Sequence, residues 1–195
     1  MNDYIKMLSE QDKLSISISP NRWQFEENPY IISGPCSVES EEMIVDWAQK
    51  MKRIGVNALR GGAYKPCTYP ITKEIGNNGW KEGLREDGLR FLKTAREESG
   101  LPIVSEIMDS NQITESTMDC IDIVQVGTRN FQNYTLLDAL GELDVPILLK
   151  RGTWGTIDEI LGAVERILVR GNEKVAICLR GVVGMPSYRH VFPSI

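Results

Sequence analysis

The sequence is short of basic residues and of long apolar runs, and each shortage argues against a class of protein. Its 22 Lys and Arg residues stand against 27 Asp and Glu residues, giving a formal net charge of −5. A general nucleic-acid binder would carry a basic excess instead. No apolar run approaches the roughly 20 residues of a membrane span, and the N-terminal stretch MNDYIKMLSEQDKLS lacks the layout of a secretory signal. We therefore expect a cytoplasmic protein with no membrane or nucleic-acid partner.

Paired cysteine motifs are also absent. The four cysteines, Cys36, Cys67, Cys120 and Cys178, include no CxxC pair, which argues against a zinc knuckle and against a thioredoxin-type redox motif. Cys120 and Cys178 stand in or beside apolar runs, so the sequence predicts that both are small core residues.

What the chain does have is a regular alternation of short apolar runs and amphipathic segments. The runs are continuous rather than alternating, as in strands buried on both faces of a parallel sheet. They cover residues 30–33, 56–60, 101–107, 121–126, 145–150 and 174–180. Helical spacing predicts helices over 41–54, 87–99, 110–118, 133–142 and 157–170, the last of these with a capping box at Thr156 and Glu159.

Alternating strands and helices predict an α/β fold with a parallel sheet, either an open doubly wound sheet or a closed barrel. A full (β/α)8 TIM barrel takes about 250 residues, so six units would form an incomplete barrel. Residues 14–18 alternate in polarity ahead of a Pro-Asn turn, which is typical of a hairpin. We expect residues 1–29 to be an N-terminal extension with this possible β-hairpin, and 30–195 to be a partial barrel domain.

Positively charged residues recur where the predicted strands end, on four of the six strands. They are Arg60, Lys65, Arg129, Lys150, Arg151 and Arg180. Each one alone could be a salt-bridged surface residue. Gathered at one mouth of an acidic protein, they would repel one another unless an anion neutralised them. The pattern therefore predicts a ligand with several negative charges, such as phosphate and carboxylate groups, which Arg and Lys both pair with.

Five ordered segments carry a family resemblance that covers about residues 30–181. They are GPCSVES, LRGGAYKPCT, QVGTRNFQNYTLL, LLKRG and GNEKVAICLRG. The chain resembles the 3-deoxy-heptulosonate 7-phosphate (DAHP) synthases and the related 3-deoxy-octulosonate 8-phosphate synthases. The resemblance implies a (β/α)8 barrel transferase that condenses phosphoenolpyruvate with an aldose phosphate. The expected aldose is erythrose 4-phosphate, which makes this the first step of the shikimate pathway to aromatic amino acids.

The same resemblance implies roles for particular residues. The phosphoenolpyruvate ligands would be Arg60, Lys65, Arg129, Lys150 and Arg180. Lys65 would also be catalytic, handling a proton near the new bond, while Thr68 would donate a hydrogen bond to the sugar phosphate. Cys36 would be a ligand of the divalent metal ion that is the family's cofactor.

Three departures from the family pattern keep alternatives open. Cys67 stands where the family's KPRT segment has its arginine. The family's other metal ligands come from the seventh and eighth strands, and His190 does not match the family's histidine. Two missing strands would leave open sheet edges, so we expect a homo-oligomer or a completing chain. The alternatives are an inactive or partner-dependent anion-binding subunit and a 3-deoxy-octulosonate 8-phosphate synthase. An unrelated open-sheet phosphate binder would need a GxGxxG turn that GPCSVE does not provide.

Overall fold

All six predicted apolar runs form strands in a computed structural model of the chain, which describes residues 15–18, 21–24, 29–65 and 83–181. Each strand is shorter than the run that predicted it. The strands are β3 (Ile32–Ser33), β4 (Ala58–Arg60), β5 (Ile103–Ile107), β6 (Ile123–Val126), β7 (Ile147–Lys150) and β8 (Val175–Cys178).

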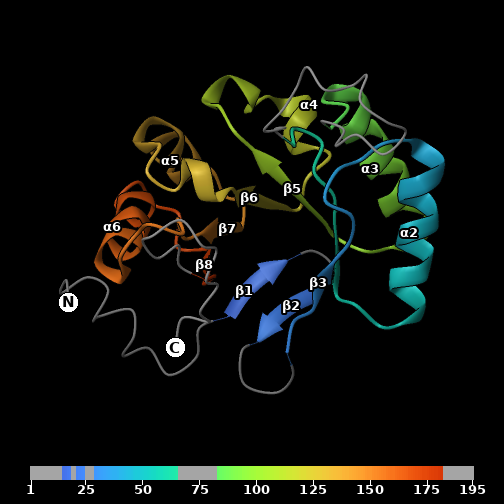
Figure 1. The fold of residues 1–195 in the computed structure, drawn as a ribbon, viewed down its shortest axis with the longest axis horizontal. Coiled ribbons are helices and arrows are strands. Elements are labelled where there is room, and N and C mark those ends of the chain that lie inside the picture. The colour runs from blue at the N-terminus through green and yellow to red at the C-terminus, as the bar shows by residue number, and fades with distance from the viewer. Residues whose placement is uncertain (1–14, 19–20, 25–28, 66–82, 182–195) are drawn as a thin grey trace, which may run out of the picture.

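The strand order decides between the two architectures that the sequence left open. The six strands lie side by side in chain order, β3 to β8, and every neighbouring pair is parallel. A doubly wound sheet would reverse its order at a switch point, whereas a barrel wall adds each strand beside the one before it. The sheet curls, with helices along its outer side (Figure 1). The prediction of an incomplete TIM-type barrel is confirmed.

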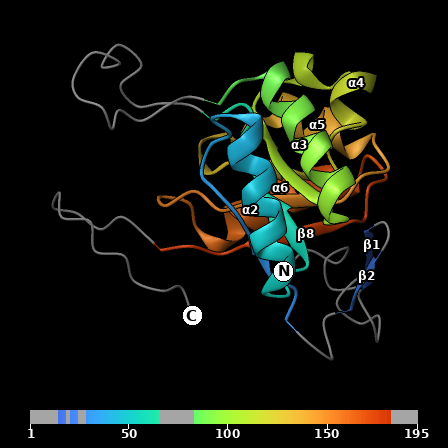
Figure 2. The same cartoon turned by 90° about the vertical axis from the view of Figure 1, so that its right-hand side faces the viewer.

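The connecting helices largely match their predicted ranges. They are α2 (Glu41–Arg53), α3 (Glu86–Ser99), α4 (Glu115–Met118), α5 (Tyr134–Gly141) and α6 (Ile157–Leu168). The capping box forms at α6, where the Glu159 N–H donates to Thr156 Oγ1 at 3.1 Å and the Thr156 N–H donates to Glu159 Oε2 at 2.7 Å. Gly100 ends α3 in the left-handed conformation, with φ of 70°. Helices α2 and α3 pack side by side (Figure 2).

The prediction of one helix over 110–118 is wrong, because two caps divide this segment. Asp109 caps the 3-10 turn η2 (Ser110–Gln112) by accepting a hydrogen bond from the Asn111 N–H at 2.8 Å. Thr114 then adopts an extended backbone and caps α4 by accepting from the Thr117 N–H at 3.2 Å. A capping residue has non-helical dihedrals, so Thr114 interrupts the helix.

Apolar side chains on the two faces of the sheet form two separate clusters. The larger packs the outer face against the helices and includes Leu59, Ile103, Val124 and Leu149. The smaller lies on the inner face, where Ala58, Val104, Ile123 and Ala176 are buried and Leu148 packs against them. Because side chains alternate along a strand, the residue two positions beyond each inner residue also faces inward. Cys120 is buried in the outer cluster, as predicted, whereas Cys178 is half-buried.

The predicted N-terminal hairpin is present as β1 (Ser15–Ile18) and β2 (Asn21–Gln24), which pair antiparallel with Ser15 opposite Gln24. The division of the chain at residue 29 stays a prediction. Within the described ranges, none of the helices combines the length and apolar character needed to cross a membrane.

Candidate functional site

A layer of polar side chains lies on the inner face of the sheet, toward the carboxyl ends of the strands. Each member stands two residues beyond an inner-face apolar residue on its own strand, so alternation directs all of them to the same face. We call this set the inner polar layer; it consists of Arg60, Glu106, Gln125, Lys150 and Cys178. The strand registers place Glu106 beside Gln125 and Lys150 beside Cys178.

Two other predicted cations, Arg60 and Arg180, lie within electrostatic range of Lys150. Burial lowers the pKa of Lys150 below its ordinary value of 10.5, and the positive charge of Arg60 lowers this pKa further. Arg180 acts in the same direction, whereas Cys178 and Glu106 favour the charged form. A bound anion would favour the protonated form of Lys150 and offset the charges of Arg60 and Arg180 beside it.

Arg180 reaches from the end of β8 to the loop that follows β6. Its Nη1 donates to Thr128 Oγ1 at 2.8 Å, which spans the intervening strand β7. Thr128 opens the 3-10 turn η3 (Thr128–Asn130), and the next residue, Arg129, is exposed on that turn. The hydrogen bond thus brings Arg180 to the segment that carries Arg129.

Glu106 contributes a buried carboxylate to this face of the site. It is 8% exposed, and its Oε2 accepts from Gln125 Nε2 at 2.9 Å. A Cβ at Gly127 would lie 1.9 Å from Glu106 Oε1, so the close approach of this carboxylate requires glycine at 127. Neither Glu106 nor Gln125 is among the site residues predicted from the sequence. Their two-residue offset from Val104 and Ile123 is the signal that would have found them.

Arg151 corrects one expectation from the sequence, because it does not join the cations at the mouth. It follows Lys150 directly and is only 2% exposed. Its guanidinium donates to the carbonyl oxygens of Gly152 at 2.9 Å and Gly155 at 2.6 Å, and to that of Arg180. Arg151 therefore links the loop after β7 to the segment that follows β8. Its contact in that segment is the backbone carbonyl of Arg180, whose side chain belongs to the cation group.

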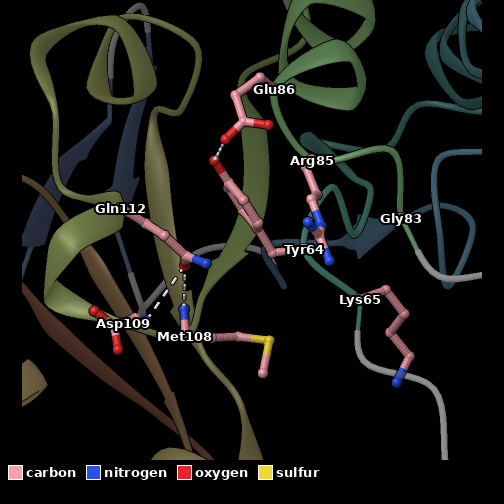
Figure 3. A pocket seen from close by; sticks show the side chains of 8 residues that line it. All are labelled: Tyr64, Lys65, Gly83, Arg85, Glu86, Met108, Asp109 and Gln112. Carbon is pink, nitrogen blue, oxygen red and sulfur yellow. Dashed lines mark hydrogen bonds between the residues drawn. The ribbon is translucent and has the colours of Figure 1, made fainter. Parts of the chain in front are cut away.

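The loops after β3 and β4 hold two more of the predicted residues. Lys65 lines a cavity together with Met108 and Gln112, which follow β5 (Figure 3). Cys36 is exposed in the loop after β3. That loop lies on the loop after β4, since the Val38 N–H donates to the Gly62 carbonyl at 3.0 Å. Thr68 lies outside the described residues.

The predicted metal site is not assembled by the described part of the chain. Among these residues, no group of three or more His, Cys, Asp or Glu side chains could hold a metal ion. Catalytic metals generally need about three protein ligands, so Cys36 by itself does not fit this role. His190 lies outside the described residues.

Comparisons with known proteins show which family the chain resembles in sequence and fold. A phospho-2-dehydro-3-deoxyheptonate aldolase of Thermotoga maritima is 41% identical over 152 residues, covering 78% of this chain and 42% of the relative. A 2-dehydro-3-deoxyphosphooctonate aldolase of Thioalkalivibrio sulfidiphilus is 24% identical over 161 residues, covering 80% of this chain and 55% of the relative. The chain thus spans about half the length of the curated relatives it matches.

Solved structures and a family comparison extend the match. A crystal structure of the DAHP synthase from Thermotoga maritima superposes with a TM-score of 0.79 at 35% identity, covering 91% of this chain and 49% of that one. A truncated form of the DAHP synthase from the same organism gives a TM-score of 0.75 at 32% identity, covering 92% and 61%. A sequence model of the DAHP synthetase I family matches residues 18–191, most of the chain. The chain therefore belongs to the DAHP synthetase I family.

Proposed function

We propose that this chain binds phosphoenolpyruvate at the carboxyl ends of its strands and takes part in condensing it with an aldose phosphate. The observation that carries the proposal is the grouping of Arg60 and Arg180 near Lys150, where burial and then their positive charges lower the pKa of Lys150. Phosphoenolpyruvate has a phosphate and a carboxylate, and its negative charge would relieve the repulsion among these cations. Lys65 and Arg129, on neighbouring loops, are proposed as further ligands.

The chemistry assigned to these residues is positioning and charge neutralisation. The enol carbon of phosphoenolpyruvate attacks the sugar aldehyde, water adds at the next carbon, and phosphate leaves. Fixed cations around the phosphate and carboxylate would hold the enol carbon in attacking geometry and offset the charge that moves during the reaction. Lys65 is proposed to handle a proton near the new bond. The steps above are carried by side chains of this chain. Among the described residues only Cys36 was expected to bind a metal ion, and a single ligand does not make a metal site.

The proposed aldose is erythrose 4-phosphate. The heptonate aldolase of Thermotoga maritima shares 41% identity with this chain, against 24% for the octonate aldolase of Thioalkalivibrio sulfidiphilus. The place of the reaction in aromatic amino acid biosynthesis follows from the same proposal. A 3-deoxy-octulosonate 8-phosphate synthase is the alternative from the related family.

Calorimetric titration of the full chain with phosphoenolpyruvate tests the binding step. Lys150→Gln should weaken binding roughly 10- to 100-fold, because a hydrogen bond to a charged group contributes about 1.5–3 kcal/mol. The matched control is Lys174→Gln, which makes the same change in charge just before β8, at the opposite end of the sheet, where Lys174 pairs with Asp144 at 2.6 Å. Absence of binding, or equal affinities for both variants, would refute the proposal.

A second candidate function is a phosphoenolpyruvate-binding chain that needs another chain for turnover. It is favoured by the lack of a three-residue metal-ligand group in the described residues. A steady-state assay with manganese, phosphoenolpyruvate and four- or five-carbon sugar phosphates separates the two functions by following phosphate release. Turnover by the purified chain alone would exclude the second candidate, and the preferred sugar would decide between the two synthase activities.

A further inference from the structure

A cavity of about 460 Å³ opens between the loop after β4, the loop after β5 and the start of α3. Two cations line it from different segments: Lys65 follows β4, and Arg85 precedes α3. In Figure 3 the Arg85 guanidinium points toward the space between the Tyr64 ring and Lys65, above Met108. The cavity therefore has a positively charged wall with an aromatic ring and a thioether beside it.

The two carboxylates that also line the cavity, Glu86 and Asp109, each accept a hydrogen bond from a neutral donor. Glu86 accepts a hydrogen bond from the Tyr64 hydroxyl at 3.3 Å, and Figure 3 shows it directed away from Lys65. Asp109 caps η2 by accepting from the Asn111 N–H at 2.8 Å. None of the ion pairs formed among the described residues involves Arg85. Its charge is therefore not neutralised by a carboxylate of this part of the chain.

A neutral donor faces the same space. Gln112 Oε1 accepts from the N–H groups of Met108 at 2.8 Å and Asp109 at 3.3 Å. These two bonds fix which end of the amide is oxygen, and they leave the Nε2 group as a donor on the cavity side (Figure 3). The wall thus combines a guanidinium, an ammonium and an amide N–H, a donor set suited to phosphate oxygens.

The backbone of Arg85 supports a role for its side chain. Its φ of 54° and ψ of −125° match the first central position of a type II′ turn, which glycine normally occupies. Among the described residues, Arg85 is the one non-glycine with positive φ. Its N–H donates to the Ala63 carbonyl at 2.8 Å, which ties it to the loop after β4. Its side chain does not cap the helix. A strained residue persists where its surroundings impose it, and such residues gather at functional sites.

We propose that Arg85, with Lys65 and Gln112, binds the phosphate group of the second substrate, a phosphate monoester on a short sugar. This assignment rests on the proposed function, in which Lys65 also contacts phosphoenolpyruvate. The guanidinium of Arg85 offers two parallel N–H donors to phosphate oxygens, and the Lys65 ammonium adds a point charge. The cavity volume leaves room for a short polyol chain beside this phosphate.

The test is calorimetric titration of the full chain with inorganic phosphate, in chelator and in saturating phosphoenolpyruvate, so that the strand-end cations are already occupied. Arg85→Met removes the charge and keeps the backbone strain, whereas Arg85→Gly removes both. Each variant should bind inorganic phosphate roughly 10- to 100-fold more weakly and bind phosphoenolpyruvate as the unaltered chain does. Arg90→Gln, an exposed change on the same helix where Arg90 pairs with Asp87, should leave both affinities unchanged.

Erythrose 4-phosphate and erythrose, titrated in chelator, identify the group recognised: Arg85→Met should weaken the first and leave the second unchanged. Arg85→Gly should also raise the midpoint of urea unfolding, because it relieves the strained φ. Inorganic phosphate affinity unchanged in both Arg85 variants, or no phosphate binding by the unaltered chain, would overturn the inference while phosphoenolpyruvate binding still upheld the proposed function. If the unaltered chain does not bind phosphoenolpyruvate, the proposed function fails, and titration of inorganic phosphate alone still tests Arg85.

Discussion

Replacing Arg151 by methionine should destabilise the chain by about 3–5 kcal/mol, because it leaves three backbone carbonyls without their hydrogen-bond donor. The Arg151 guanidinium donates to three backbone carbonyls, those of Gly152, Gly155 and Arg180. Hydrogen bonds to charged groups contribute about 1.5–3 kcal/mol each, which sums to about 5–9 kcal/mol before offsets. The offset comes from releasing a buried charge whose Nε has no hydrogen-bond partner among the described residues.

Urea unfolding followed by tryptophan fluorescence and by circular dichroism measures this loss. Trp154 is a local reporter, because its ring packs against Phe131 with centroids 5.9 Å apart, beside the carbonyls that Arg151 binds. Against a total stability of about 5–15 kcal/mol, the midpoint should fall markedly with little change in slope. The control Arg90→Met removes an arginine whose side chain is 72% exposed and should change stability by about 0.5 kcal/mol or less. A loss below about 1 kcal/mol for Arg151→Met, with the slope unchanged, would refute this account of the loop after β7.

Three further predictions concern the site. Gly127→Ala would place a Cβ 1.9 Å from Glu106 Oε1, so it should lower stability by about 1–3 kcal/mol and weaken phosphoenolpyruvate binding; unchanged values for both would mean that Glu106 can move aside freely. Phosphoenolpyruvate affinity should fall as the pH rises through the pKa of Lys150, which is lowered below 10.5. The anion binds the protonated amine best, and in the free site this amine loses its proton at a lower pH than an ordinary lysine does. Calorimetry in buffers of different ionisation enthalpy should detect proton uptake in that range, and Lys150→Arg should flatten the profile; a flat profile in the unaltered chain would contradict it. Removing divalent metal with EDTA should change phosphoenolpyruvate affinity by about twofold or less, because side-chain cations supply the attraction; a large loss would indicate a metal among the ligands.

The strands could be predicted from the sequence because they are buried on both faces and therefore read as continuous apolar runs. Their ends were less predictable. The run at 30–33 yields the two-residue strand Ile32–Ser33, since hydrophobicity alone does not say where ladder hydrogen bonds stop. The helix predicted over 110–118 failed for a different reason. Thr114 lies inside the predicted range, but its hydroxyl caps a new helix.

Sequence motifs alone do not predict which side chains of the site face the same way. Lys150 and Arg151 are adjacent cations at the end of one strand, and composition gives no reason to separate them. Strand alternation directs the Lys150 side chain to the inner face of the sheet and the Arg151 side chain to the opposite face. There Arg151 is buried and donates hydrogen bonds to backbone carbonyls. The same alternation would have identified Glu106. The position of Arg85 could not be predicted at all, because its φ of 54° depends on how the start of α3 meets the loop after β4.

The order of the strands has a consequence for how the chain folds. Each strand pairs with its successor along the sequence, from β3 to β8, so every ladder closes a loop no longer than one strand–helix unit. Loop-closure entropy grows with loop length, and folding rates fall as the mean sequence separation of contacts rises. The sheet can therefore assemble one strand–helix unit at a time, from the N-terminal strand to the C-terminal one, which is the order in which a ribosome synthesises them.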